Sequence, residues 1–409
     1  MFCMVKYEIK KVFAKNSSKI AILLLLAVCL VTGWFAMSTA YVNEAGESEK
    51  GPAAVRKLRT EKEAWSGVLN MELIAKVIEE NRRISLTPEA TSKDYHQNNI
   101  AYSWKQGFSD VRDLLNSSYA DGFQEYNYYK ADSLLPEQAE DFYPNRTRLL
   151  QEWLKEDAAE RFSAEEKAYL LQQYEKMPVP LAYEYMEGWT QLFEYSSTII
   201  MIVVLVLGYL VAGIFSDEFQ WRTDSVFFTS YHGRNKAISA KIKAGFVIAT
   251  VVYWVVLLLF SLAVLLYYGT SGANSLIQTD WGKWKSIYYI TNQQAYLLIT
   301  IGGYLGCVFI TSLTMLVSAK TKSTVVAVLV PFMLTFIPSF ISGLDYVWVN
   351  KIIGLLPDQL LQISMALRLF NLYSVGGNVV GALPILFIMY AVMFTVLQPV
   401  IYRVYRLQQ

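Results

Sequence analysis

Cysteine and histidine are scarce in this chain of 409 residues, which contains three cysteines and two histidines. The cysteines Cys3, Cys29 and Cys307 lie near the start of the chain or in apolar runs, so no disulfide is expected in the polar segment 41–194. His96 and His232 are far apart in the sequence, which argues against a zinc site. The sequence therefore predicts no metal site.

Motifs of nucleotide binding and catalysis are also missing. The chain has no GxxxxGK[ST] loop and is not expected to bind ATP by that device, and it has no GxSxG nucleophile elbow. Its apolar runs lack the central carboxylates that proton- or sodium-driven carriers use as relays. We expect no catalytic residue, no cofactor bound by this chain and no nucleic-acid partner. If the chain moves a substrate, another protein must supply the energy.

Long apolar runs are what the sequence does contain: 54% of its residues are hydrophobic and only 17% are charged. A helical span needs roughly 20 apolar residues to cross a bilayer core of about 30 Å. Six runs meet this test, at 20–40, 195–214, 244–267, 295–319, 324–341 and 379–401. The first run is too long for the apolar part of a signal peptide, so an uncleaved span is favoured over that alternative. The predicted fold class is an all-α polytopic membrane protein with six transmembrane helices.

The distribution of charge predicts how the spans are oriented. The N-terminus, the loops after the second and fourth spans and the C-terminal tail together carry 14 basic and four acidic residues. Segment 41–194 carries 18 basic and 28 acidic residues. Because basic residues stay on the cytoplasmic side, both termini are expected inside and 41–194 outside. The absence of cysteine from that segment favours a bacterial cytoplasmic membrane.

The first residues form an amphipathic pattern. Val5, Ile9, Val12 and Phe13 fall on one helical face, while lysines occupy the rest. Such a helix typically lies in the headgroup layer, with its lysines near anionic lipid. A charged flank that only sets the orientation is the alternative.

The segment 41–194 is long enough to bury a core of its own and reads as mostly helical. Leu58, Trp65 and Val77 keep helical spacing along one stretch. Ser163 followed by Glu166 predicts a capping box at the start of a later helix. We expect a folded module here and not a linker.

The stretch before the last span is apolar but is broken by Gly354, Pro357 and Asp358. Two short re-entrant helices would explain it, since backbone at membrane depth must be helical or covered by protein. Two further spans are the alternative, and each piece is too short for one.

These patterns divide the chain as follows: an interfacial helix (1–18), the first span (19–40), the extracytoplasmic module (41–194), the second span (195–216), a cytoplasmic loop (217–243), the third span (244–268), an outer loop (269–294), the fourth span (295–319), a cytoplasmic turn (320–323), the fifth span (324–343), re-entrant outer helices (344–377), the sixth span (378–402) and a cytoplasmic tail (403–409).

The loop 217–243 contains the most specific local pattern. It begins with acidic residues, continues with the apolar residues Val226, Phe227 and Phe228, and ends with basic residues. A short helix with exposed apolar residues and flanking charges suits docking of a soluble partner. An interfacial loop whose charges only set orientation is the alternative.

The pattern in this loop resembles the first cytoplasmic loop of type-two ABC (ATP-binding-cassette) permeases, through Glu218, Arg222-Thr223, Phe228-Thr229-Ser230, Gly233-Arg234 and Ala240-Lys241. Arg222 stands where that family commonly has glycine, and Tyr231 where it has proline. The order of segments is also similar over nearly the whole chain. The large module after the first span resembles the subset that exports sodium, drugs or lipids.

The resemblance implies a permease subunit that pairs with a second, identical or homologous permease and with two ATPase subunits, which bind ATP and Mg. The loop would be a coupling helix seated in a groove of the ATPase, with Glu218 and Arg222 making polar contacts at its base. The residues it assigns to coupling are Glu218, Arg222, Thr223, Phe227, Phe228, Ser230, Arg234 and Lys241.

The resemblance also suggests an export route between the second and fifth spans of the two protomers. Pro331 and Pro338 would bend the fifth span there, and Gly302 and Gly306 form a small-xxx-small pair for close helix packing. The substrate would be an amphipathic or hydrophobic peptide, lipid or drug. A surface sensor that recruits a signalling protein, or a membrane enzyme acting on lipid-linked substrates, are the competing hypotheses.

Overall fold

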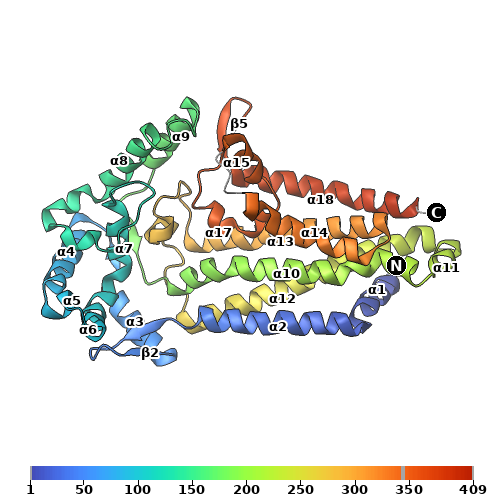
Figure 1. Cartoon of the computed structure of the whole chain (residues 1–409), viewed down its shortest axis with the longest axis horizontal. Coiled ribbons are helices and arrows are strands. Elements are labelled where there is room, and N and C mark those ends of the chain that lie inside the picture. Colours follow the sequence, from blue (N-terminus) through green and yellow to red (C-terminus); the bar gives the residue numbers. More distant parts are fainter. Residues whose placement is uncertain (1, 342–345, 408–409) are drawn as a thin grey trace.

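A computed structural model describes residues 2–341 and 346–407. The end of the predicted fifth span (342–343), the start of the predicted re-entrant segment (344–345), residue 1 and the last tail residues (408–409) lie outside the described residues. Both ends of the chain lie on the same side of a long helical bundle (Figure 1), which we call the terminus side. The opposite end carries 41–194 and is called the module side.

Within the described residues, six helices are long and apolar enough to cross a membrane. Their bounds are α2 Asn16–Ala36, α10 Glu187–Gln220, α12 Ile238–Tyr268, α13 Asn292–Thr321, α14 Thr324–Ile341 and α18 Ala382–Arg406. They lie side by side along the bundle (Figure 1). The prediction of a mostly helical chain with six helices long and apolar enough to span a membrane is confirmed.

Helices α10 and α13 form the centre of the bundle. The apolar windows of both are 67% buried, against 22% for α2 and α14 and 17% for α18. α10 crosses α14 closely, because a Cβ on Gly208 would lie 2.3 Å from Cγ of Pro331. Pro331 and Pro338 are both buried inside α14. The outer helices therefore leave apolar faces exposed around a protein-packed centre.

The first helix, α1 (Phe2–Ala14), is separated from α2 by the extended residue Lys15. Val12 is buried, Ile9 and Phe13 pack against the core, and Val5 is partly buried. The predicted apolar face of α1 therefore meets the bundle. Its contact with lipid headgroups stays a prediction.

The module 41–194 consists of helices and two very short antiparallel ribbons. Their bounds are β1 Ala40–Val42, β2 Ser48–Lys50, α3 Pro52–Glu63, β3 Gly67–Val68, α4 Met71–Ser85, α5 Pro88–Thr91, α6 Tyr95–Lys105, η1 Gln106–Phe108, α7 Ser109–Ser118, η2 Lys130–Ser133, η3 Pro136–Asp141, α8 Phe142–Lys155, α9 Ala164–Glu175 and β4 Ala182–Tyr183. Strand β1 pairs with β2, and β3 pairs with β4.

Two local predictions in the module had different outcomes. The capping box is confirmed: Glu166 N donates to Ser163 Oγ (3.2 Å) and Ser163 N donates to Glu166 Oε2 (2.9 Å). The continuous helical spacing from Leu58 to Val77 was misleading, because α3 ends at Glu63 and α4 begins at Met71. Gly67, at φ 153°, and the N-cap Asn70 interrupt the helix.

The segment before α18 differs from the predicted pair of helices. Its described residues, from 346 on, contain three short helices and a hairpin: α15 Val347–Ile353, α16 Asp358–Leu361, α17 Ile363–Ala366, β5 Leu372–Val375 and β6 Asn378–Gly381. The hairpin takes the first residues assigned to the sixth span, so α18 begins at 382. Gly302 and Gly306 of α13 face this segment, because a Cβ on them would lie 2.0 Å from Ile363 Cδ1 and 2.8 Å from Leu361 Cδ2.

Between α12 and α13, residues 269–291 contain two short 3₁₀ turns, η5 Ile277–Thr279 and η6 Trp281–Lys283. Arg146 of α8 joins the module to this loop by donating to the carbonyl oxygens of Trp284 (2.9 Å) and Ser286 (2.8 Å). Its guanidinium also lies 3.7 Å from the ring centre of Tyr174. The module is thus fastened to the bundle by a buried arginine.

Candidate functional site

The loop with the specific sequence pattern lies at the tip of the terminus side (Figure 1). It contains a short helix, α11 (Asp224–Thr229), and a single π-helical turn, η4 (Gly233–Ala237), between α10 and α12. We call residues 221–237 the tip.

A buried lysine holds the base of the tip. Lys241 of α12 has no exposed side-chain surface, and its Nζ lies 2.7 Å from Glu218 Oε1 and 3.2 Å from Glu8 Oε2. It also donates to the carbonyl oxygen of Ile214 (2.7 Å). Lys11 reaches the same Glu218 oxygen at 2.6 Å. These charges, which we call the base network, connect α1, α10 and α12.

The start of α2 is attached to the same place. Lys15 Nζ lies 2.5 Å from Asp217 Oδ2. Lys11 Nζ and Lys15 Nζ are 5.0 and 5.4 Å from the centre of the Trp221 ring, within the range of a cation–π contact. The α1–α2 junction is therefore fixed to the end of α10.

Aromatic rings anchor the tip to α18. The ring of Tyr405, which is fully buried, lies 4.6 Å from Phe215 and 6.0 Å from Phe219, centre to centre. From the tip, Phe227 and Phe228 approach the same ring at 5.9 and 5.4 Å. Of the predicted apolar pair, Phe228 is therefore buried against α18, whereas Phe227 is only partly buried.

Backbone contacts set the shape of the tip. Arg222 has a positive φ of 55°, and Thr223 N donates to the carbonyl oxygen of Glu218 (2.8 Å). Ser230 Oγ and Arg234 Nε donate to the carbonyl oxygens of Phe227 (2.8 Å) and Phe228 (3.1 Å).

Gly233 closes the turn that follows α11. A Cβ at this position would lie 1.8 Å from the carbonyl oxygen of Phe227, far inside contact distance. The close approach of the two backbone segments therefore requires glycine.

The apolar surface that the tip does offer comes from other residues. Tyr231 is 93% exposed, Val226 is 71% exposed and Trp221 is 54% exposed. A separate cavity of about 360 Å³ lies between α1 and the tip and is lined in part by Tyr7, Glu8 and Phe227. These exposed side chains form the candidate contact surface.

The predicted coupling residues therefore have different environments. Glu218 and Lys241 belong to the buried base network, whereas Arg222 is exposed on the tip. Glu218 is only 6% exposed and already pairs with two lysines, so its predicted polar contact is made within the chain.

Sequence reasoning missed Glu8, Lys11, Lys15, Asp217 and Tyr405 as parts of this site. The carboxylate pair Asp217-Glu218 at the end of an apolar run was the available signal, because charges there need partners.

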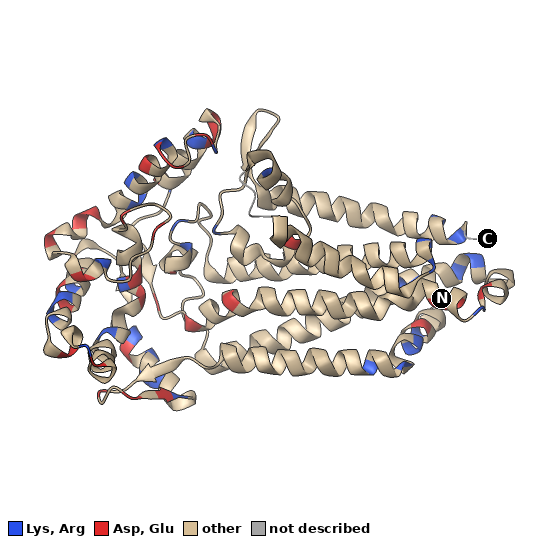
Figure 2. Cartoon of the chain, in the orientation of Figure 1, with Lys and Arg blue, Asp and Glu red and all other residues tan. Residues whose placement is uncertain are grey.

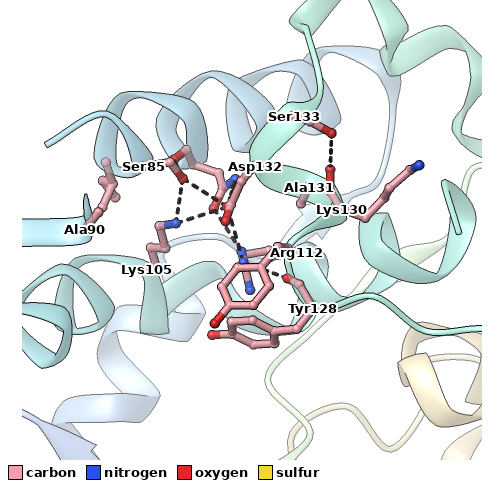
Figure 3. A network of polar contacts seen from close by, with 12 residues as sticks. Ser85, Ala90, Lys105, Arg112, Tyr128, Lys130, Ala131, Asp132 and Ser133 are labelled. Carbon is pink, nitrogen blue, oxygen red and sulfur yellow. Dashed lines mark hydrogen bonds and ion pairs between the residues drawn. The ribbon is translucent and has the colours of Figure 1, made fainter. Parts of the chain in front are cut away.

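Buried charges also occur inside the module (Figure 3). Asp132 Oδ1 lies 3.1 Å from Lys105 Nζ and 3.2 Å from Arg112 Nη2, and it accepts from Asn81 Nδ2 at 2.9 Å. Burial alone would raise the pKa of Asp132, but attraction by Arg112, together with Asn81 and Lys105, lowers it below its usual value.

A second buried cation joins the module to α10. Lys62 Nζ lies 2.8 Å from Asp110 Oδ1 and 3.3 Å from Glu187 Oε2, and Tyr183 donates to Asp110 Oδ2 at 2.7 Å. Burial alone would lower the pKa of Lys62, but the two carboxylates outweigh it and raise that pKa. Within residues 2–341 and 346–407, no group of three or more His, Cys, Asp or Glu side chains is placed to hold a metal ion.

Comparison with protein-family models, with curated proteins and with solved structures finds no match to this chain.

Proposed function

We propose that this chain is the permease subunit of an ATP-driven exporter of the type-two ABC class, in a bacterial cytoplasmic membrane. Both termini and the tip would be cytoplasmic, and the module extracytoplasmic. α1 would lie at the headgroup layer, and residues 346–377 would enter the outer leaflet. Two ATPase subunits, which hold ATP and Mg, and a second permease would complete the transporter. Its substrate would be an amphipathic or hydrophobic peptide, lipid or drug.

The observation that carries this proposal is how the tip is anchored. Its exposed side chains, Val226 and Tyr231, are apolar and suited to a groove in a soluble partner. Directly behind them, the base network and the Tyr405 ring cluster connect to α1, α10, α12 and α18. A partner that pulls on the tip therefore moves four helices as one body, which is what coupling to ATP hydrolysis requires.

The movement would reach the transport route through α10. This helix is continuous from Glu187 to Gln220, so displacement at the tip is transmitted along its full length. Its close contact with α14, at Gly208 and Pro331, would carry the displacement into the fifth span. The outward side chains of α14, including Phe332 and Phe336, are exposed and would meet the second permease.

The proposal is tested by purifying the full-length chain from its native membranes and identifying bound proteins by mass spectrometry. We expect ATP-binding-cassette subunits to co-purify, and the double variant Val226→Asp/Tyr231→Asp to lose them together with ATP turnover. Leu407→Asp is the matched control, because Leu407 is 80% exposed and lies at the end of α18 on the same side of the bundle. Absence of an ATPase subunit, or equal retention in both variants, would overturn the proposal.

A further inference from the structure

A cleft of about 940 Å³ lies on the module side, away from the tip. One wall is the turn between α8 and α9, and the other is formed by α15 and the residues leading into β5. Figure 1 shows α8 and α9 facing α15 and β5. The volume lies in the upper part of the range of small-molecule sites, about 300–1,000 Å³.

The two walls differ in charge. Figure 2 shows many charged residues on the α8–α9 side and few on the side of α15 and the hairpin. Four carboxylates line the cleft against two cations, Arg161 and Lys351. Three of those carboxylates, Glu156, Asp157 and Glu160, are exposed at the α8–α9 turn. The cleft therefore attracts positive charge.

The fourth carboxylate belongs to Glu166 and is paired with a lysine. Lys351 Nζ of α15 reaches across the cleft to Glu166 Oε1 at 2.7 Å. The Glu166 side chain is only 4% exposed, and its other oxygen accepts from Ser163 N. The Lys351 side chain is 43% exposed, so the lysine is the accessible member of the pair and the carboxylate is the enclosed one. The Glu166 carboxylate thus accepts a primary ammonium group that is presented from the cleft.

The opposite wall supplies apolar surface. Val347, Ile353 and Leu369 line it, and Phe370 continues into the aromatic cluster of the module, 5.8 Å from Phe123, centre to centre. A ligand lying here would contact aliphatic and aromatic side chains on one side and carboxylates on the other.

We infer that this cleft binds a cationic amphipathic ligand, such as a short basic peptide, whose ammonium group takes the place of Lys351 at Glu166. The apolar side chains of the ligand would lie on α15, and its further cations would lie near the α8–α9 turn. Anionic ligands, including phospholipid headgroups, are disfavoured by the same carboxylates. The inference goes beyond the proposed function, because binding is measured on this chain without any ATPase.

The test measures binding of a dye-labelled Lys–Leu peptide to the full-length chain in phosphatidylcholine nanodiscs, by fluorescence anisotropy. A Glu–Leu peptide of equal length is the control ligand. We expect only the basic peptide to bind, with an affinity that falls as salt is raised.

Two single variants should act in opposite directions. Glu166→Gln keeps a side-chain acceptor for Ser163 N but removes the charge, and we expect binding to weaken about tenfold, the loss of about 1.4 kcal/mol. Lys351→Gln frees the carboxylate, and we expect binding to tighten about threefold, because the ammonium group of the ligand no longer has to displace the lysine. General damage to the fold would weaken binding in both.

A triple variant tests the exposed carboxylates. Glu156→Gln/Asp157→Asn/Glu160→Gln should weaken binding and flatten its salt dependence. The matched control, Glu79→Gln/Glu137→Gln/Glu140→Gln, removes three exposed carboxylates elsewhere on the module and should leave binding unchanged. Equal binding of the two peptides, or equal effects of the two triple variants, would overturn the inference.

Discussion

The two sides of the bundle use lysine–carboxylate pairs in different ways. On the terminus side, Lys241 is fully buried and contacts two carboxylates and a backbone carbonyl. On the module side, Lys351 is 43% exposed and contacts one carboxylate across an open cleft. Breaking a buried pair leaves an unpaired charge without water, whereas an exposed pair separates at little cost. The first arrangement joins three helices through buried charges, and the second is a single contact between the two walls of a cleft.

Replacing the buried lysine tests the arrangement on the terminus side, for which we expect the larger loss of stability. Lys241→Met leaves Glu218 and Glu8 buried without this cation, and we expect a loss of about 3–5 kcal/mol in the free energy of unfolding. Thermal unfolding of the purified chain in detergent measures it. Lys236→Met, which alters an exposed lysine of the tip, is the control and should shift the midpoint little. Equal shifts of the two midpoints would show that the buried Lys241 contributes no more to stability than an exposed lysine does.

Removing Asp132 tests whether the charged contacts inside the module stabilise its fold, in contrast to the pair that spans the open cleft. Asp132→Asn leaves Lys105 and Arg112 without their carboxylate, at a cost of about 2 kcal/mol. The folded pKa of Asp132 is lowered below the unfolded value, so its stabilisation is complete above about pH 4–5 and is lost as pH falls through the folded pKa.

The stability of the variant and of the parent chain is therefore compared at pH 7 and at acidic pH. We expect Asp132→Asn to be less stable than the parent chain at pH 7 and the difference to shrink on acidification, followed by near-ultraviolet circular dichroism. A difference that grows with acidity would contradict the assigned direction of the pKa.

Adding a methyl group to the tip tests its shape independently of charge. Gly233→Ala forces the Phe227 carbonyl away, and we expect a loss of about 1–2 kcal/mol together with weaker ATPase binding. Gly33→Ala is a suitable control, since its nearest neighbour would be the flexible end of Met37 at 3.8 Å. Unchanged behaviour of Gly233→Ala would mean that the turn is not tightly held.

The smallest expected effect is on the stability of the open side. Lys351→Gln removes a half-exposed lysine from the enclosed Glu166 carboxylate, and we expect a change of at most about 1 kcal/mol in the free energy of unfolding. Measured beside Lys241→Met under one protocol, it gives the contrast directly. A loss as large as that of Lys241→Met would show that the cleft is also a fixed contact.

The sequence predicted those parts of the fold that depend on neighbouring residues. Apolar runs identified six long helices, and the Ser163–Glu166 spacing identified a helix start, because both are local. The hairpin β5–β6 was missed, since its apolar residues, such as Val379 and Val380, read as the start of the sixth span.

The site was predictable only in outline, because its contacts join distant parts of the chain. Lys241 was assigned to the coupling loop 217–243 from its place in a motif, but its partner Glu8 lies 233 residues away. Phe227 and Phe228 read as exposed docking residues because the sequence does not show that Tyr405 would cover them. The sequence alone does not distinguish apolar residues that pack inside the chain from apolar residues that bind a partner.

The base network also has a consequence for how the protein is made. Glu8 and Lys11 leave the ribosome long before Lys241, and Glu218 also precedes it. Until α12 has been synthesised, Glu8 of α1 lacks the lysine with which it pairs. Helix α1 therefore reaches its final position only after Lys241 of α12 has been synthesised.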